Sequence, residues 1–276
     1  MSLARIVLVW CLCSTATSVA IGQELRVFTR TVDLSGLSPD QYAKAPIIAR
    51  SITLFHAGKV YDYIDSAREV TIFEPVHRRF TILHEASGAV TSVSQDEVRR
   101  FLEMAEDEGL QRIASGTRNG AGSKLDFLRF QLRPEFKIHV DEPASRVRME
   151  HTLMQYEAEC AAPPPGMMAK AYFDYADAIV QLNAVLHPQS IWPAPRLQLN
   201  DELRQREWLP RSVRRQINGP APSDLRAEHE WEWKLNDHSR QMLAKWDREL
   251  REGSVRKLEF RQFQQEILTG KLTSTR

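Results

Sequence analysis

The chain has 276 residues, with 37 Lys and Arg against 36 Asp and Glu, so its formal net charge is +1 at pH 7. Proteins that bind nucleic acids through phosphate contacts normally carry a basic excess on one face. The near-neutral balance therefore argues against a nucleic-acid partner.

The first 22 residues have the layout of a secretory signal peptide. Arg5 is their only charged side chain, an uncharged and mostly apolar run follows it, and small residues precede possible cleavage sites after Ala20 and Gly22. We expect a signal peptide over residues 1–22, a single α+β domain over 23–276 with a possible subdivision near 161–166, and a secreted or periplasmic location. No later apolar run is long enough to cross a bilayer, so we expect no transmembrane segment.

Cysteine usage fits this interpretation. Cys11 and Cys13 would leave with the signal peptide, and neither follows the small residue that a lipoprotein cleavage site needs. Cys160 would then be the only cysteine of the mature chain, which excludes an internal disulfide.

The first part of the mature chain predicts an antiparallel meander. Short runs rich in β-branched and aromatic residues alternate with compact turns, which is typical of consecutive hairpins. The expected strands cover residues 25–34, 48–56, 60–64, 69–73 and 79–83.

A helix and further strands are expected next. Ser94 and Glu97 have the spacing of a capping box, and the helix that they begin is expected to end near Gly109. Strands are then expected over residues 126–132, 136–140 and 146–157.

A proline run at 163–165 precedes the clearest helix of the sequence, over residues 167–186. Its polar residues form one narrow stripe, which predicts that the helix is mostly buried against the open or concave face of the sheet. The stripe consists of Lys170, Asp174, Asp177 and Gln181.

The remaining elements are a short helix over 200–207, strands over 213–217 and 227–235, and helices over 237–251 and from Phe260 to Gly270. Strict alternation over 227–235 places apolar residues and His229 on one side and charged residues on the other, which predicts a half-buried strand.

The acidic residues of this strand, Glu228, Glu230 and Glu232, suit either glycosidase chemistry or cross-strand charge pairing with Arg214 and Arg215. We favour charge pairing.

No motif predicts a catalytic centre, a metal or a cofactor. The eight histidines lack metal-binding spacing, serine-nucleophile and phosphate-loop motifs are absent, and no signature surrounds Cys160. We therefore expect no cofactor, no metal and no catalytic residue.

The expected strand over 227–235, which carries two tryptophans, and the expected helix over 167–186 form the candidate site. Their residues can fill a closed core, which is the simpler interpretation, or line a cavity for an apolar ligand. The expected lining consists of Met168, Tyr172, Tyr175, Ile179, His229, Trp231 and Trp233.

The segment Val60 to Leu83, with Tyr61-Asp62 and Glu74-Pro75 at its turns and strands, resembles the meander of the periplasmic lipoprotein carrier superfamily. The resemblance implies an incomplete β-barrel closed by helices, with an apolar cavity for acyl chains. This chain is longer, with an added tryptophan strand and two C-terminal helices. The resemblance places no binding residue beyond the meander.

The expected fold is therefore a curved antiparallel sheet, an incomplete β-barrel, with helices packed over its concave face. The leading functional hypothesis is a non-enzymatic extracytoplasmic protein that binds a lipid or an acylated partner. The alternatives are a secreted hydrolase whose active site follows no motif and a structural or interaction module of the cell envelope. The sequence does not indicate an oligomeric state.

Overall fold

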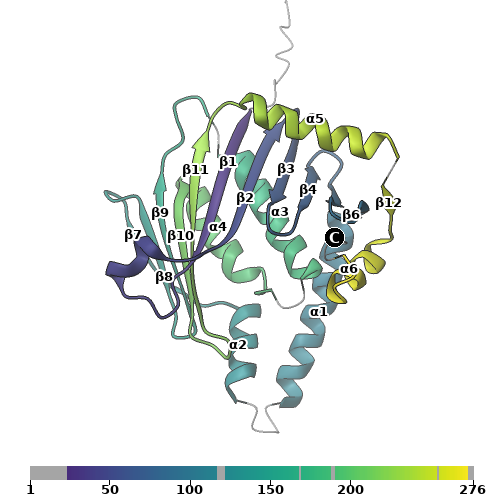
Figure 1. The fold of residues 1–276 in the computed structure, drawn as a ribbon. Coiled ribbons are helices and arrows are strands. Elements are labelled where there is room, and N and C mark those ends of the chain that lie inside the picture. The colour runs from purple at the N-terminus through teal and green to yellow at the C-terminus, as the bar shows by residue number, and fades with distance from the viewer. Residues whose placement is uncertain (1–23, 117–121, 168, 188–189, 254, 273–276) are drawn as a thin grey trace, which may run out of the picture.

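The structure, a computed structural model, describes residues 24–116, 122–167, 169–187, 190–253 and 255–272. The expected signal peptide lies outside the described residues. Within them the chain forms an α+β fold of twelve strands and seven helices (Figure 1). The strands are β1 (Leu25–Asp33), β2 (Ile47–His56), β3 (Lys59–Ile64), β4 (Glu69–Glu74), β5 (Arg79–His84), β6 (Ala89–Ser94), β7 (Lys137–Asp141), β8 (Arg146–Glu150), β9 (Met154–Ala161), β10 (Leu209–Ile217), β11 (Ser223–Glu232) and β12 (Arg256–Lys257). The helices are the short 3-10 helix η1 (Pro39–Lys44), α1 (Gln95–Gly116), α2 (Gly122–Leu132), α3 (Lys170–Leu186), α4 (Ala194–Gln205), α5 (Asp237–Arg251) and α6 (Phe260–Leu268).

All twelve strands belong to one sheet in the order β12-β6-β5-β4-β3-β2-β1-β11-β10-β9-β8-β7. Neighbours are antiparallel except β12, which runs parallel to β6. Within the described residues nothing pairs the β12 end with the β7 end, so the sheet is open. Residues 161–166 were considered as a possible boundary between subdomains. Strand β9, which ends at Ala161, pairs with β10, which lies after this segment, so the sheet continues across it.

The expected meander is confirmed and extends by one strand, β6. Its first hairpin shows why the chain turns so tightly. His56 pairs with Lys59, and the two residues between them, Ala57 and Gly58, have φ angles of 49° and 74°. A two-residue loop with both angles positive matches the right-handed twist of the flanking strands, and glycine adopts such an angle without strain.

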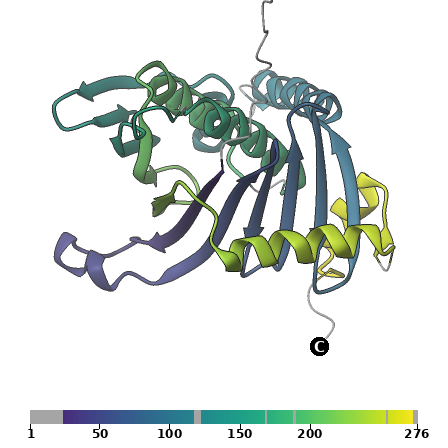
Figure 2. The same cartoon turned by 90° about the horizontal axis from the view of Figure 1, so that it is seen from above.

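Successive side chains of the meander point to opposite faces of the sheet, and both faces are covered. Phe55 and Val60 pack with α3 on one face, whereas Leu54 and Tyr61 pack with α5 on the other. We call these the α3 face and the α5 face. Figure 2 shows α5 along one side of the strands and the bundle of α1, α3 and α4 on the other side.

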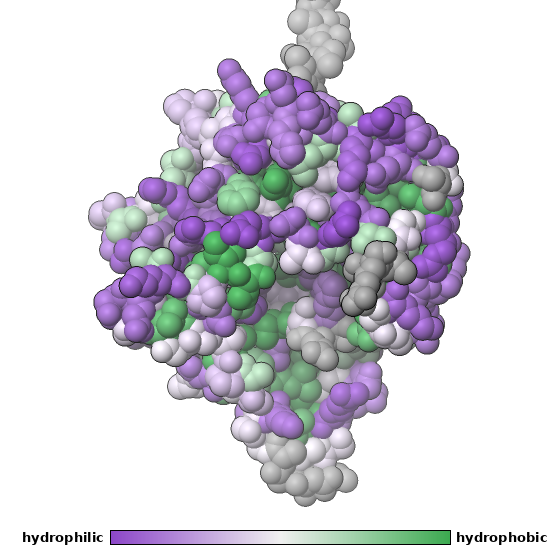
Figure 3. All heavy atoms as spheres, viewed as in Figure 1, coloured by the Kyte–Doolittle hydropathy of each residue, from purple (hydrophilic) through white to green (hydrophobic). Residues whose placement is uncertain are grey.

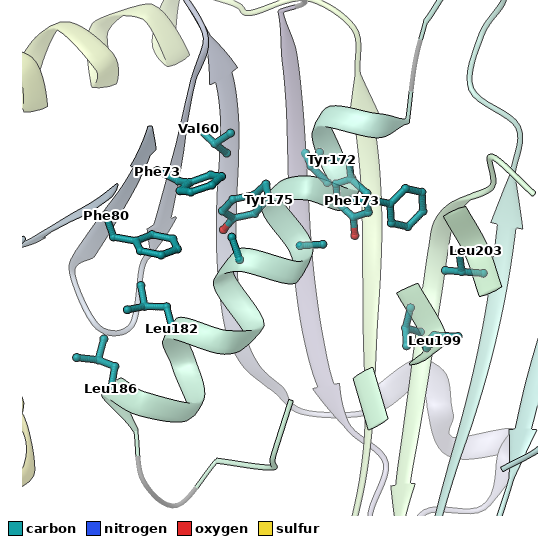
Figure 4. Packing of buried hydrophobic residues seen from close by; sticks show 14 of the residues in the cluster. Val60, Phe73, Phe80, Tyr172, Phe173, Tyr175, Leu182, Leu186, Leu199 and Leu203 are labelled. Carbon is teal, nitrogen blue, oxygen red and sulfur yellow. The ribbon is translucent and has the colours of Figure 1, made fainter. Parts of the chain in front are cut away.

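The core of the α3 face is built around the buried side of helix α3. Phe73 and Phe80 stack with ring centroids 4.9 Å apart, and Tyr175 meets Phe55 edge-on at 5.9 Å. Figure 4 shows Tyr175, Leu182 and Leu186 directed from α3 toward the strands. A mostly buried helix was predicted over 167–186, and the structure confirms it over Lys170–Leu186.

Three predictions about the middle of the chain were wrong. Residues 126–132 form helix α2 rather than a strand, because Leu132 packs against Gly109 of α1 and Phe130 stacks on His151 with ring centroids 4.2 Å apart. Helix α1 continues past Gly109 to Gly116. The single strand expected over 146–157 is divided into β8 and β9 by a turn.

In the part of the chain that the structure describes, no helix is long and apolar enough to cross a membrane. Hydrophilic residues dominate the surface seen in Figure 3, and apolar residues gather in smaller patches toward its centre.

Candidate functional site

A cavity of about 610 Å³ lies on the α3 face, between helix α3 and the part of the sheet that contains β1, β9, β10 and β11. Ser190, Ile191 and Trp192, which precede α4, and Arg196 in its first turn complete its walls. We call it the α3 cavity. Its lining residues are Thr31, Tyr156, Val180, Asn183, Ser190, Ile191, Trp192, Arg196, Val213, Arg215, Ile217, Ala221, Pro222, Ser223, Leu225 and Ala227.

Strand alternation places an arginine within the apolar wall of this cavity. Val213, Arg215 and Ile217 of β10 point to the same face, because they are two residues apart. Val213 and Ile217 are buried in the core cluster. Leu225 of β11 pairs directly with Arg215 and adds to the same wall.

In the part of the chain that the structure describes, the two cavity arginines, Arg196 and Arg215, have no carboxylate partner. The Nε of Arg196 donates to Asn200 Oδ1 at 2.9 Å, and Asn200 Nδ2 donates to Asp177 at 2.8 Å. Asp177 itself forms an ion pair with Arg204. The Nε of Arg215 is buried without a hydrogen-bond partner. Among the described residues, no Asp or Glu oxygen lies within 4.0 Å of a charged nitrogen of Arg196 or Arg215, whereas most other arginines are paired.

Tyr156 of β9 completes the polar part of the cavity. Burial raises the pKa of its phenol above the usual range, and the positive charges of Arg215 and Arg196 act against that rise. The phenol is therefore neutral at pH 7, and its oxygen accepts a hydrogen bond from the Arg215 side chain.

His229 lies on the same face, beside Thr29 of β1. Its Nδ1 is 2.9 Å from Thr29 Oγ1, and its Nε2 is buried without a partner. Burial lowers the pKa of His229 to about 3, and Arg196 contributes in the same direction. The imidazole is therefore neutral at pH 7 and adds no charge to this region.

A second cavity, of about 300 Å³, lies at the other end of the α3 face and is lined in part by Glu69, His84 and His187. Glu69 is only 6% exposed and has no hydrogen-bond partner among the described residues. Burial, together with the nearby charge of Asp62, raises its pKa to about 7. Asp62 accepts a 2.7 Å hydrogen bond from Thr53 Oγ1, and burial raises its pKa as well.

The structure places the residues of the predicted site in the packed core beside the α3 cavity. Tyr172 and Tyr175 are buried, and Ile179, Trp231 and Trp233 pack against the same core. Tyr172 meets Trp231 edge-on at 4.9 Å, and the two tryptophans stack at 6.2 Å. His229 lies beside Trp231, with ring centroids 6.4 Å apart, while Met168 lies outside the described residues. The cavity is lined instead by sequence neighbours of these residues, such as Val180 and Ala227.

The acidic row of β11 forms cross-strand ion pairs, but not with the expected partners. Glu228 pairs with Arg30 and Glu232 with Arg26, both on β1. Arg214 pairs with Asp224 instead, at 2.6 Å. The expectation of pairing with Arg214 and Arg215 was wrong because β11 also has β1 as a neighbour, and β1 lies more than 190 residues away in the sequence.

Cys160 is 7% exposed, and burial raises the pKa of its thiol to about 12. The thiol is therefore protonated at neutral pH and lacks the nucleophilic thiolate form.

Sequence reasoning missed Arg196, Arg215 and Tyr156. One signal for Arg215 was available, since arginine is rarely buried and here stands between two apolar residues of the inward side of a strand. The position of Arg196 depends on how α4 packs on the sheet, and no local pattern indicates that.

Within the described ranges, no group of three His, Cys, Asp or Glu side chains could hold a metal ion. No protein-family model matches the chain, and comparison with curated proteins finds no match.

Proposed function

We propose that the chain binds an apolar or amphiphilic ligand, such as a lipid or an acylated partner, in the α3 cavity. The observation that carries the proposal is the cavity itself. Its volume of about 610 Å³ falls within the range of small-molecule sites, roughly 300–1,000 Å³. More than half of its lining residues are apolar, and none is acidic.

The proposal includes an architecture like that of the periplasmic lipoprotein carriers, an incomplete barrel with helices over its concave face. The open antiparallel sheet supports it, as does the packing of α3 on one face with a cavity beside it. We also propose that the protein acts outside the cytoplasm, on the basis of the first 22 residues.

The two alternatives receive less support. A hydrolase that uses Cys160 needs an activated thiolate, but burial keeps this thiol protonated. A purely structural module would have a filled core, whereas the α3 cavity leaves space for a ligand.

The test is to purify the full chain after export, identify bound lipids by native mass spectrometry and organic extraction, and titrate a fluorescent fatty-acid probe. Ala221→Trp places a large side chain at the cavity wall, in an exposed turn that tolerates it. We expect wild type to bind the probe and Ala221→Trp to bind it at least about tenfold more weakly, because the indole occupies the space of the ligand.

The matched control is Ala144→Trp, the same substitution in an exposed turn between β7 and β8, away from the cavity. It should bind the probe like wild type. Wild-type protein that carries no lipid and does not bind the probe would refute the proposal.

A further inference from the structure

We propose that the polar end of the ligand is an anion, a carboxylate or a phosphate, and that Arg196 and Arg215 bind it. This inference rests on the proposed function, because it specifies the ligand of the same cavity. It specifies the charge of the ligand, which the volume of the cavity and its apolar walls do not determine.

The first support is the distribution of charge around the cavity. Neighbouring arginines are neutralised by the protein: Arg214 by Asp224 and Arg204 by Asp177. Arg196 and Arg215 line the cavity without a carboxylate partner among the described residues, and no lining residue is acidic. A cation in an apolar wall is costly unless an anion compensates it. A bound anion would supply that compensation.

The second support is the arrangement of donors. Asn200 accepts from the Nε of Arg196, and the Arg196 side chain also forms a hydrogen bond with Tyr172, so its guanidinium is held in place at the cavity wall. Among the described residues, the buried Nε of Arg215 has no hydrogen-bond partner, while the Arg215 side chain forms a hydrogen bond with the neutral hydroxyl of Tyr156. Guanidinium groups match carboxylate and phosphate oxygens bidentately, so this set is suited to an oxyanion.

The third support is that the rest of the cavity is apolar. Val180, Ile191 and Trp192 come from the helical side, and Val213 and Leu225 come from the sheet. One ligand can therefore place an anionic head at the arginines and an apolar body against these walls. That description fits a single-chain acid or an alkyl phosphate.

The experiment measures calorimetric affinities of the full chain for dodecanoate, dodecyl phosphate and dodecanol, below their aggregation concentrations. The three share one chain and differ in the head group. We expect the two anions to bind about tenfold or more tightly than the alcohol, as charge-assisted hydrogen bonds require. Comparing dodecanoate with dodecyl phosphate identifies which anion is preferred.

The variants locate the effect. Arg215→Gln should reduce anion affinity to that of dodecanol and leave dodecanol binding unchanged, whereas Arg215→Lys, which keeps the charge, should retain part of the preference. Arg211→Gln is the control, because Arg211 is an exposed residue of the same strand outside the cavity. It should bind all three ligands like wild type.

Three results would overturn the inference. Equal binding of alcohol and anions by wild type would show that the charge is not recognised, while the proposed function would stand. If Arg215→Gln still bound the anions more tightly than dodecanol, the anion would lie elsewhere. The same conclusion would follow if the control Arg211→Gln lost the preference for anions to the same extent. Failure of all three ligands to bind would instead refute the proposed function, and this inference with it.

Discussion

The two halves of the sheet differ in how many of their faces the chain covers. In the half formed by β2–β6, α3 packs on one face and α5 on the other, and every residue of β4 is buried. In the half formed by β8–β11, the face away from α3 carries ion pairs, such as Arg148 with Glu157 at 3.3 Å. Buried and less buried residues alternate along β9 accordingly.

This difference in coverage suggests that the two halves of the sheet have different roles, one in stability and the other in ligand binding. Strands covered on both faces are apolar on both sides, whereas strands with one solvated face alternate. The doubly covered half encloses a second core, built around Trp246 of α5. The singly covered half borders the α3 cavity. We therefore expect the first half to dominate the free energy of unfolding and the second to determine ligand binding.

The largest expected effect is that of Trp246→Ala. Trp246 is 1% exposed, packs against Tyr61 and Tyr63 with ring centroids 6.1 and 5.6 Å away, and donates to Glu85 at 2.9 Å. Its truncation leaves a cavity and removes the hydrogen bond to Glu85, which keeps its ion pair with Lys245, so urea denaturation should show a loss of about 3–5 kcal/mol. Trp233→Ala, at a partly buried tryptophan on the α3 face, should reduce the free energy of unfolding by a smaller amount. Equal losses would contradict the division between the halves.

The next effect is a pH dependence caused by Glu69. Its pKa is raised from 4.5 to about 7 in the folded state, so between these values the folded protein holds a proton that the unfolded chain has released. The contribution of Glu69 to stability therefore falls as pH rises from 4.5 to 7, by about 3 kcal/mol at most, and is constant outside that window.

Glu69→Gln removes this titration while keeping the size of the side chain. Urea denaturation at several pH values should show that the variant gains stability relative to wild type as pH rises through this window. Glu103→Gln, at an exposed position of α1, is the control and should leave the wild-type pH dependence unchanged. Parallel pH curves for wild type and Glu69→Gln would disprove the prediction.

The smallest effect is expected on the solvated face of the β1–β11 pair. Arg30 and Glu228 form a cross-strand ion pair there, but both side chains are partly exposed. A double-mutant cycle with Arg30→Gln and Glu228→Gln should give a coupling energy below about 1 kcal/mol, reduced further by salt. A coupling of several kcal/mol would show that this face stabilises the fold as strongly as the covered one does.

Local sequence patterns predicted the elements whose neighbours are close in the chain. The hairpins of β2–β5 follow from β-branched runs and tight turns, and the bounds of α5 match the prediction over 237–251. Asn236 explains that agreement, because its side chain accepts from Ser239 N at 2.9 Å and caps the helix.

Patterns failed where distant contacts decide the structure. Residues 126–132 were expected to form a strand, yet the contacts of Phe130 and Leu132 with His151 and α1 select a helix. The candidate site depended on distant contacts in the same way. The cavity forms where β1, β9, β10 and β11 meet α3 and α4, and sequence periodicity does not specify which strands become neighbours.

The open sheet also has two ends with different protection against self-association. Along β6, the two-residue strand β12 pairs in parallel with Ala89 and Val90 and covers that part of the strand edge. At the opposite end, β7 pairs only with β8 within the described residues, and it carries Lys137, His139 and Asp141. Charged side chains on an edge strand disfavour the addition of another strand. The chain therefore covers part of one edge with its own backbone, whereas at the other edge charged side chains disfavour the addition of a further strand.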